Sequence, residues 1–123
     1  MNKPFSITFK VSGKPERLNK TLQLHWGKRA VLNKRWYDII HYAVIRKLPP
    51  KPLEKFTIKV VLFNNRHLDF DGSVGSLKPL IDGLERAGLI KDDSYKRTGP
   101  WLVTQEKCKK GFEYVELTIT ERL

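Results

Sequence analysis

The chain has 123 residues, of which 40% are hydrophobic and 11% aromatic. This composition is typical of one folded domain over residues 1–123 and excludes a largely disordered chain. The single cysteine, Cys108, excludes an internal disulfide and a cysteine-based zinc site. No apolar run approaches the roughly 20 residues of a membrane span, and the first residues lack the apolar block of a signal peptide. We therefore expect a cytoplasmic protein that does not contact a membrane.

The positive charge is concentrated in the first half of the chain. The formal net charge is +11 and the pI about 9.9. Residues 1–68 hold 15 Lys and Arg against 3 Asp and Glu, whereas residues 69–123 hold 9 against 10. Such an excess favours a polyanionic partner, with nucleic acid ahead of an acidic membrane surface. The alternative is a basic domain without such a partner.

The first element is a half-buried strand over residues 5–11, where apolar and polar residues alternate. A long loop is expected over residues 12–32, and loops of this length usually bind something or are disordered. Trp26 in this loop is either an exposed ring for an unstacked base or a plug in the core. The loop's basic residues, which suit contacts with phosphates, are Lys14, Arg17, Lys20, Lys28 and Arg29.

Two helices and three further strands are expected after the loop. Asn33 can cap a helix that ends near Lys47, in which His41 is a structural or surface residue. A strand over residues 55–64 is apolar on both faces near its end and is therefore central. Ser76 can cap a second helix that stops at Gly88. Strands over residues 101–108 and 113–120 are joined by KKGF, which suits a hairpin turn. The pattern predicts an α+β (mixed α/β) fold, a small mixed sheet of about four strands carrying two main helices.

Acidic residues surround the second helix. Asp69 and Asp71 are two apart at the end of a strand-like stretch and are expected on one face. Asp92 and Asp93 follow the helix, and Lys78 lies in its first turn. Carboxylates this close favour a cation such as Mg²⁺ or Mn²⁺ between them. The open alternatives are solvated turn carboxylates, a structural cation site and a catalytic metal site for phosphodiester hydrolysis.

Two basic side chains near this stretch have open roles. Lys78 can pair with Asp82 on the helix surface, or it can steady charge on a phosphate. Arg66, with His67 beside it, can contact phosphate next to the carboxylates or serve as a simple turn residue.

This stretch resembles the RusA-type Holliday junction resolvases. The pattern that carries the resemblance comprises Asp69, Asp71, Lys78, Asp82, the Ala87–Gly88 pair and the Asp92–Asp93 pair. The resemblance implies a bacterial or phage-encoded homodimer that cuts four-way DNA junctions in recombination and repair, by paired incisions with Mg²⁺ or Mn²⁺. It implies no small-molecule cofactor. It implies that Asp69, Asp71 and Asp93 bind metal and act in catalysis, with Lys78 near the scissile phosphate.

The sequence departs from the family pattern at two places. Gly72 stands where the family has Asn, and the gap from Asp71 to Lys78 is three residues longer, which places the insertion in GSVGS. Asp92 either orients Asp93 or shares the metal.

The alternative functions are a branched-DNA-binding module with weak or no catalysis, and a nuclease for flaps or other branches.

Overall fold

The computed structural model describes residues 4–13, 26–66, 77–99 and 101–122. Four strands and three helices are found in these ranges, together with one short 3-10 helix. In chain order they are β1 (Ser6–Ser12), α2 (Trp26–Val44), η1 (Ile45–Lys47), β2 (Phe56–Asn64), α4 (Lys78–Arg86), α5 (Tyr95–Thr98), β3 (Leu102–Lys107) and β4 (Tyr114–Glu121).

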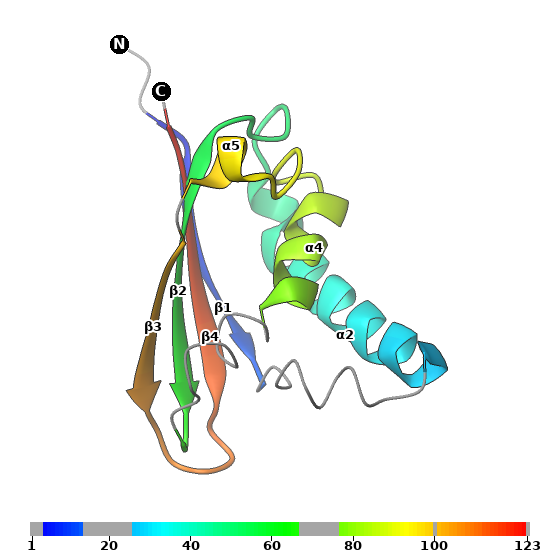
Figure 1. The fold of residues 1–123 in the computed structure, drawn as a ribbon, viewed down its shortest axis with the longest axis vertical. Helices are drawn as coiled ribbons and strands as arrows, with labels where there is room; N and C mark the ends of the chain where they lie inside the picture. The colour runs from blue at the N-terminus through cyan, green and yellow to red at the C-terminus, as the bar shows by residue number, and fades with distance from the viewer. Residues whose placement is uncertain (1–3, 14–25, 67–76, 100, 123) are drawn as a thin grey trace.

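The strands form one mixed sheet in the order β1-β4-β2-β3. β4 pairs antiparallel with both β1 and β2, whereas β3 pairs parallel with β2. The two long helices, α2 and α4, lie together on one side of this sheet (Figure 1). The predicted α+β fold of about four strands and two main helices is therefore confirmed, and β2 is central as predicted. Among the described residues, no helix is long and apolar enough to cross a membrane.

The predicted hairpin between β3 and β4 is wrong. A turn does form there, with the Phe112 amide donating to the Lys109 carbonyl at 3.0 Å. However, β2 lies between the two strands it connects. A tight turn fixes the direction of the next strand but not its partner. Because β2 is apolar on both faces near its end, it takes the central position and bonds to β3 and β4 on either side.

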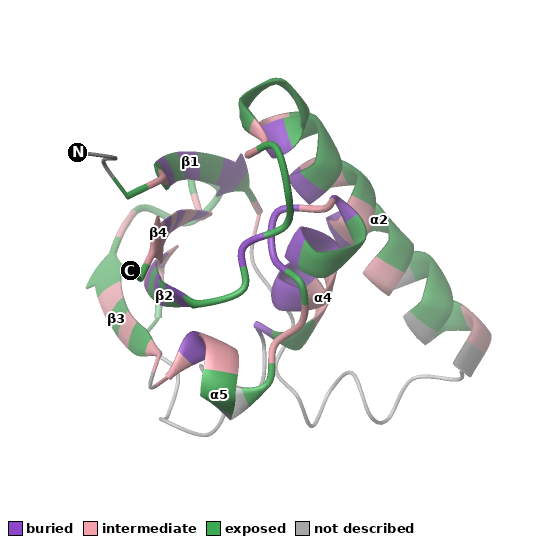
Figure 2. Ribbon diagram, turned by 90° about the horizontal axis from the view of Figure 1, so that it is seen from above, coloured by how far each residue is buried: buried purple, intermediate pink, exposed green. Residues whose placement is uncertain are grey.

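The core lies between the sheet and the two helices. Alternate residues of the paired strands form rows across the buried face, and one row contains Phe9, Leu117, Val60 and Val103. The buried sides of α2 and α4 face the sheet (Figure 2). Fully or nearly fully buried side chains on the helices are Trp36, Ile40 and Val44 of α2, and Leu80, Ile81 and Leu84 of α4.

Helix α2 begins earlier than predicted. It starts at Trp26, so Asn33 lies inside the helix instead of capping it, and residues 26–32 are helical instead of part of a loop. Among the α2 side chains that the structure describes before Trp36, none is buried. These first turns run away from the sheet (Figure 1), so the described side chains on them form no buried stripe that would mark a helix. His41 is exposed on this helix, as expected of a surface residue.

Helix α4 has the predicted buried stripe and the predicted stop. Gly88 has a φ of +87°, its amide bonds the Glu85 carbonyl, and the Leu89 amide bonds the Leu84 carbonyl. This pair of bonds is a Schellman motif, which favours glycine at that place. At the other end Leu77 is the N-cap and has no side-chain cap bond, while Ser76, the predicted cap, lies outside the described residues.

Candidate metal and phosphate site

The turn that carries Asp92 and Asp93 is attached to the residues that precede β2. Leu53 forms a bridge with Ile90: the Leu53 amide donates to the Leu89 carbonyl at 2.9 Å, and the Lys91 amide donates to the Leu53 carbonyl at 3.0 Å. Leu53, Leu89 and Ile90 are all buried. The backbone that leads into Asp92 therefore has a fixed position against the core.

Lys78 brings two carboxylates together. Its Nζ donates to Oδ2 of Asp93 at 2.7 Å and lies 3.0 Å from Oδ1 of Asp82. The Asp82 and Asp93 side chains are 28% and 29% exposed, and that of Lys78 is 58% exposed. The predicted surface pair between Lys78 and Asp82 is confirmed, but it is only one of two pairs. The three side chains form a small charged cluster that solvent and a ligand can reach.

The hydrogen bond that Lys78 donates to Asp93 raises the pKa of Lys78. The bond to Asp82 and the charges of both carboxylates also raise it, while partial burial acts against them. Since the ordinary lysine value is already about 10.4, Lys78 is a cation at neutral pH. It cannot act as a general base there. Its chemical role can only be to donate hydrogen bonds and to neutralise negative charge.

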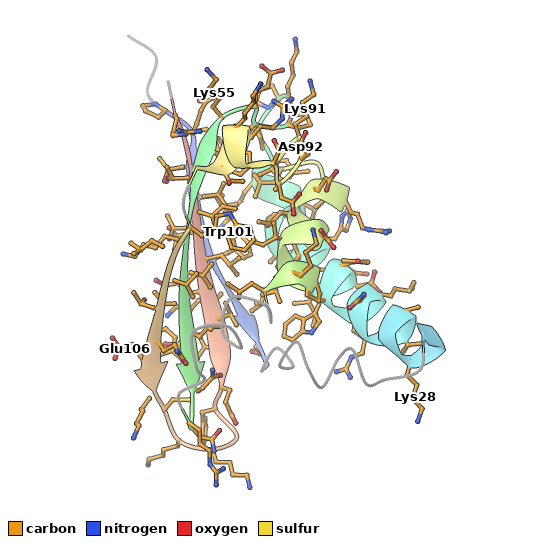
Figure 3. All side chains as sticks on the ribbon, viewed as in Figure 1. Lys28, Lys55, Lys91, Asp92, Trp101 and Glu106 are labelled. Atoms are coloured by element: carbon orange, nitrogen blue, oxygen red, sulfur yellow. The ribbon has the colours of Figure 1, made fainter. Side chains whose placement is uncertain are left out.

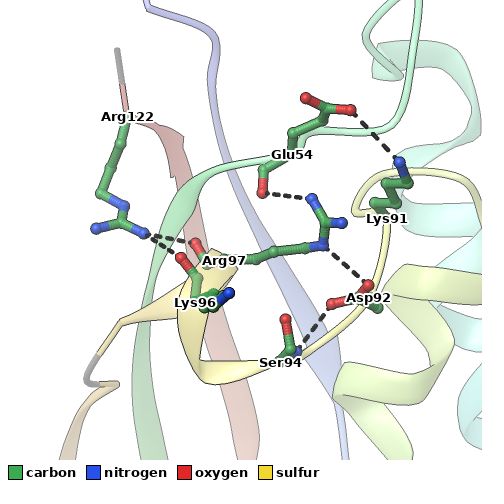
Figure 4. Close-up of polar contacts among 7 residues, drawn as sticks. All are labelled: Glu54, Lys91, Asp92, Ser94, Lys96, Arg97 and Arg122. Carbon is green, nitrogen blue, oxygen red and sulfur yellow. Dashed lines mark hydrogen bonds and ion pairs between the residues drawn. The ribbon is translucent and has the colours of Figure 1, made fainter.

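Asp92 is engaged in contacts within its own turn (Figure 4). Its Oδ1 accepts from the Ser94 amide at 3.0 Å, and its Oδ2 accepts from Nε of Arg97 at 2.9 Å. The Ser94 bond, followed by the contact with Arg97, lowers the pKa of Asp92. Because both oxygens of Asp92 already have partners, Asp93 is the better candidate for a metal ligand. Figure 3 shows Asp92 beside Lys91, between α5 and the end of α4.

Two arginines extend this network to the rest of the fold. Arg97 also donates from Nη1 to the Glu54 carbonyl at 3.3 Å, just before β2. Arg122, which follows β4, donates to the carbonyls of Lys96 and Arg97 at 3.2 and 2.8 Å (Figure 4). The short helix α5 is thus held from both sides. No sequence pattern predicts these contacts, since the carbonyls that accept them are 25 or more residues away.

Only part of the predicted site can be located. Asp69 and Asp71 lie outside the described residues, as do Lys14, Arg17 and Lys20. Within the described ranges, no three His, Cys, Asp or Glu side chains gather closely enough to hold a metal ion. Asp93 fits a hard cation as a partly exposed carboxylate with one oxygen not bonded to Lys78. The predicted meeting of Asp69, Asp71 and Asp93 stays a prediction.

The described members of the predicted DNA-binding set are exposed. Lys28 points away from the body at the start of α2 (Figure 3). Arg66 is exposed just beyond the end of β2. Arg29 lies on α2, and its side chain, like that of Trp26, is outside the description. Lys28 and Arg29 therefore lie on a helix and not in the predicted loop.

Asn64, the last residue of β2, is not among the site residues predicted from the sequence. It is buried, at 1% exposure, and its side-chain nitrogen and oxygen have no hydrogen-bond partner among the described residues. Burying an unpaired amide costs about 1–3 kcal/mol. The strand pattern places position 64 on the core face, so an amide there could have been recognised as unusual.

Comparison of the chain with known protein families finds no match, and comparison with curated proteins finds none either. Family membership therefore stays a prediction from the sequence pattern.

Proposed function

We propose that this chain is a divalent-metal-dependent endodeoxyribonuclease of the RusA type, which cuts four-way DNA junctions by paired strand incisions. The observation that supports this proposal most is the contact of Lys78 with both Asp82 and Asp93. These three residues are separated in sequence, and all belong to the pattern on which the resemblance depends. A structural role alone needs only the Lys78–Asp82 pair within the helix.

The proposed roles follow from the chemistry of the side chains. Asp69, Asp71 and Asp93 would hold Mg²⁺ or Mn²⁺ through carboxylate oxygens. When bound, the ion would supply Lewis acidity toward a phosphoryl oxygen and toward water. Lys78, a permanent cation near neutral pH, would donate to the phosphate and offset the charge that develops on it. Lys28, Arg29 and Arg66 would add affinity for the DNA backbone, with Lys14, Arg17 and Lys20.

A homodimer is part of the proposal. A four-way junction has approximate twofold symmetry, and two copies related by a C₂ axis would place two sites on opposed strands. Paired incisions then need no second binding event.

The test is a nicking assay on a fixed four-way junction with Mg²⁺, Mn²⁺ or EDTA. We expect cleavage with either metal and none in EDTA. Asp71→Asn and Asp93→Asn should abolish cleavage while junction binding is retained or tightened, because repulsion between carboxylate and DNA falls. Asp38→Asn is the matched control, because Asp38 pairs with Lys34 on the exposed side of α2 at 3.5 Å. It should cleave like the wild type.

Other outcomes would identify a different function. Salt-dependent junction binding without nicking in either metal would indicate a branched-DNA-binding module. Faster cleavage of a flap or fork than of the junction would indicate a nuclease for other branches. If a folded Asp92→Asn were inactive while Asp93→Asn cleaved like the wild type, the choice of Asp93 as the ligand would be wrong.

A further inference from the structure

The connection between β3 and β4 presents an aromatic ring and three lysines to solvent. This segment, residues 107–113, is called here the β3–β4 turn. Phe112 is 72% exposed, and Lys107, Lys109 and Lys110 are exposed without an ion pair to any described residue. The turn crosses beyond the end of β2 at the lower edge of the sheet (Figure 1).

The turn has a defined conformation. The Phe112 amide donates to the Lys109 carbonyl at 3.0 Å, and the Gly111 amide donates to Oε2 of Glu113 at 2.7 Å. Gly111 has a φ of +92°, which favours glycine. These bonds hold Phe112 outward, so its ring gives up burial that would stabilise the fold by roughly 1.5–3 kcal/mol. They also engage the carboxylate of Glu113, the acidic residue of the turn.

A hollow of about 570 Å³ lies between this turn and the end of β1. Phe112, Tyr114, Lys10 and Ser12 are among the residues that line it. The Tyr114 ring is stacked on Phe63 with centroids 4.2 Å apart and planes 10° apart. Nζ of Lys10 lies 5.3 Å from the centre of the Tyr114 ring and 3.9 Å from Glu116. The hollow thus combines two aromatic side chains with a cation.

This chemistry suits an unpaired nucleotide. A base can stack on an exposed aromatic ring regardless of its sequence, and nearby lysines neutralise the adjoining phosphates. A regular duplex keeps its base faces stacked and cannot use such a ring. Three exposed lysines on the turn, which have no ion pair with a described residue, disfavour an apolar peptide as the occupant. Among the described residues around them, the carboxylates of Glu113 and Glu116 have partners of their own, while Glu106 is exposed on β3.

We propose that the β3–β4 turn and the adjacent hollow bind an unpaired nucleotide of DNA, with the base stacked on the exposed ring of Phe112, at the edge of Tyr114, and the phosphates at Lys107, Lys109 and Lys110. The inference rests on the proposed function only in taking DNA as the partner. It assigns to this end of the sheet the recognition of unstacked bases, which occur where strands branch.

The test measures binding of the intact protein to a labelled oligo(dT) by fluorescence anisotropy in EDTA, where no metal-dependent cleavage occurs. Phe112→Ala should weaken binding about 5- to 140-fold, the equivalent of about 1–3 kcal/mol for one stacked base. Phe112→Trp should restore it. Tyr42→Ala is the matched control, since Tyr42 on α2 is an aromatic residue with 81% exposure that lies outside the hollow. It should bind like the wild type.

Two further measurements separate stacking from general attraction. Replacing Lys109 and Lys110 by Gln should reduce the slope of log affinity against log salt by about 1.4, or 0.7 for each lost phosphate contact. A 2-aminopurine placed in the oligonucleotide should be quenched by the wild type and not by Phe112→Ala. Equal binding by Phe112→Ala, Tyr42→Ala and the wild type would overturn the proposal, as would failure of the wild type to bind oligo(dT) at low salt. Neither result depends on whether the protein cleaves junctions.

Discussion

Replacing Lys78 with Met separates a structural role of this residue from a catalytic one. The substitution removes the charge but keeps a long side chain, so it breaks the contacts with Asp93 at 2.7 Å and Asp82 at 3.0 Å. Lys78 is 58% exposed, and exposed ion pairs contribute only about 0.2–1 kcal/mol each because solvent screens them. We expect the free energy of unfolding in urea to fall by about 1 kcal/mol, and by no more than about 2.

The expected loss of activity is larger than this. Removing one group that stabilises transition-state charge lowers the rate by about 10²–10³-fold, equivalent to about 3–4 kcal/mol. The measurement is the single-turnover rate of nicking a fixed four-way junction at saturating protein. Lys34→Met is the control, because it breaks a similar i,i+4 pair with Asp38 at 3.5 Å on α2. That variant should nick at the wild-type rate.

The pKa of Lys78 makes the prediction sharper. Because the contacts with Asp93 and Asp82 raise it, the ion pairs are fully formed below the ordinary lysine value of about 10.4 and are lost only as pH rises through the raised value. Lys78→Arg should therefore keep the wild-type shape of the rate profile between about pH 6 and 9. The reasoning is refuted if Lys78→Met nicks within a few-fold of the wild type. It is also refuted if the variant loses far more stability than two exposed pairs can supply.

Two further predictions concern the scaffold of the site. In Gly83→Ala the added Cβ would lie 3.2 Å from Cβ and Cγ1 of Ile40 and 3.4 Å from Cα of Tyr37. Such overpacking destabilises a core by about 1–3 kcal/mol, which should exceed the gain of about 1 kcal/mol from the higher helix propensity of alanine. Urea unfolding should show a less stable protein, and a more stable one would contradict the close approach of α2 and α4. The second prediction concerns Asp92, whose pKa is lowered in the folded protein. Its contribution to the free energy of unfolding is therefore full above the ordinary aspartate pKa of about 3.9 and is lost as pH falls through the lowered pKa. Asp92→Asn should have a lower thermal midpoint than the wild type at neutral pH, with the difference shrinking in acid, whereas a constant difference would contradict this role.

Much of the fold could be read from local patterns. Alternation in residues 5–11 and 55–64 predicted strands that the structure has as β1 and β2, because one face of each is buried against the helices. The stripe and the stop of α4 were equally clear, since Gly88 allows the positive φ that the end of the helix requires. These features depend on contacts within a few residues or on burial of a whole face.

Features that depend on distant partners were not predictable. The pairing of β3 with β2 instead of β4 depends on which strands compete for the two sides of β2, and no local turn encodes that competition. The first turns of α2 have no fully buried side chain among those that the structure describes there, so burial did not mark them as a helix. Phe112 was interpreted only as part of a turn, although its exposure is what makes the turn a candidate surface.

The separate roles of Asp92 and Asp93 show why the site needed a structure. Two identical neighbours give the same sequence signal. They are distinguished by their contacts, which are with Ser94 and Arg97 for Asp92 and with Lys78 for Asp93. Fixing a residue that is free in solution costs roughly 1–2 kcal/mol of backbone entropy. Here the turn is held without any ligand. Asp92 is bonded to Ser94 and Arg97, and the backbone just before Asp92, at Leu89 and Lys91, is bonded to Leu53. A metal ion or phosphate at the proposed Asp93 site would therefore not bear that cost, so the proposed role of Asp92 is to hold this turn and not to touch the ligand.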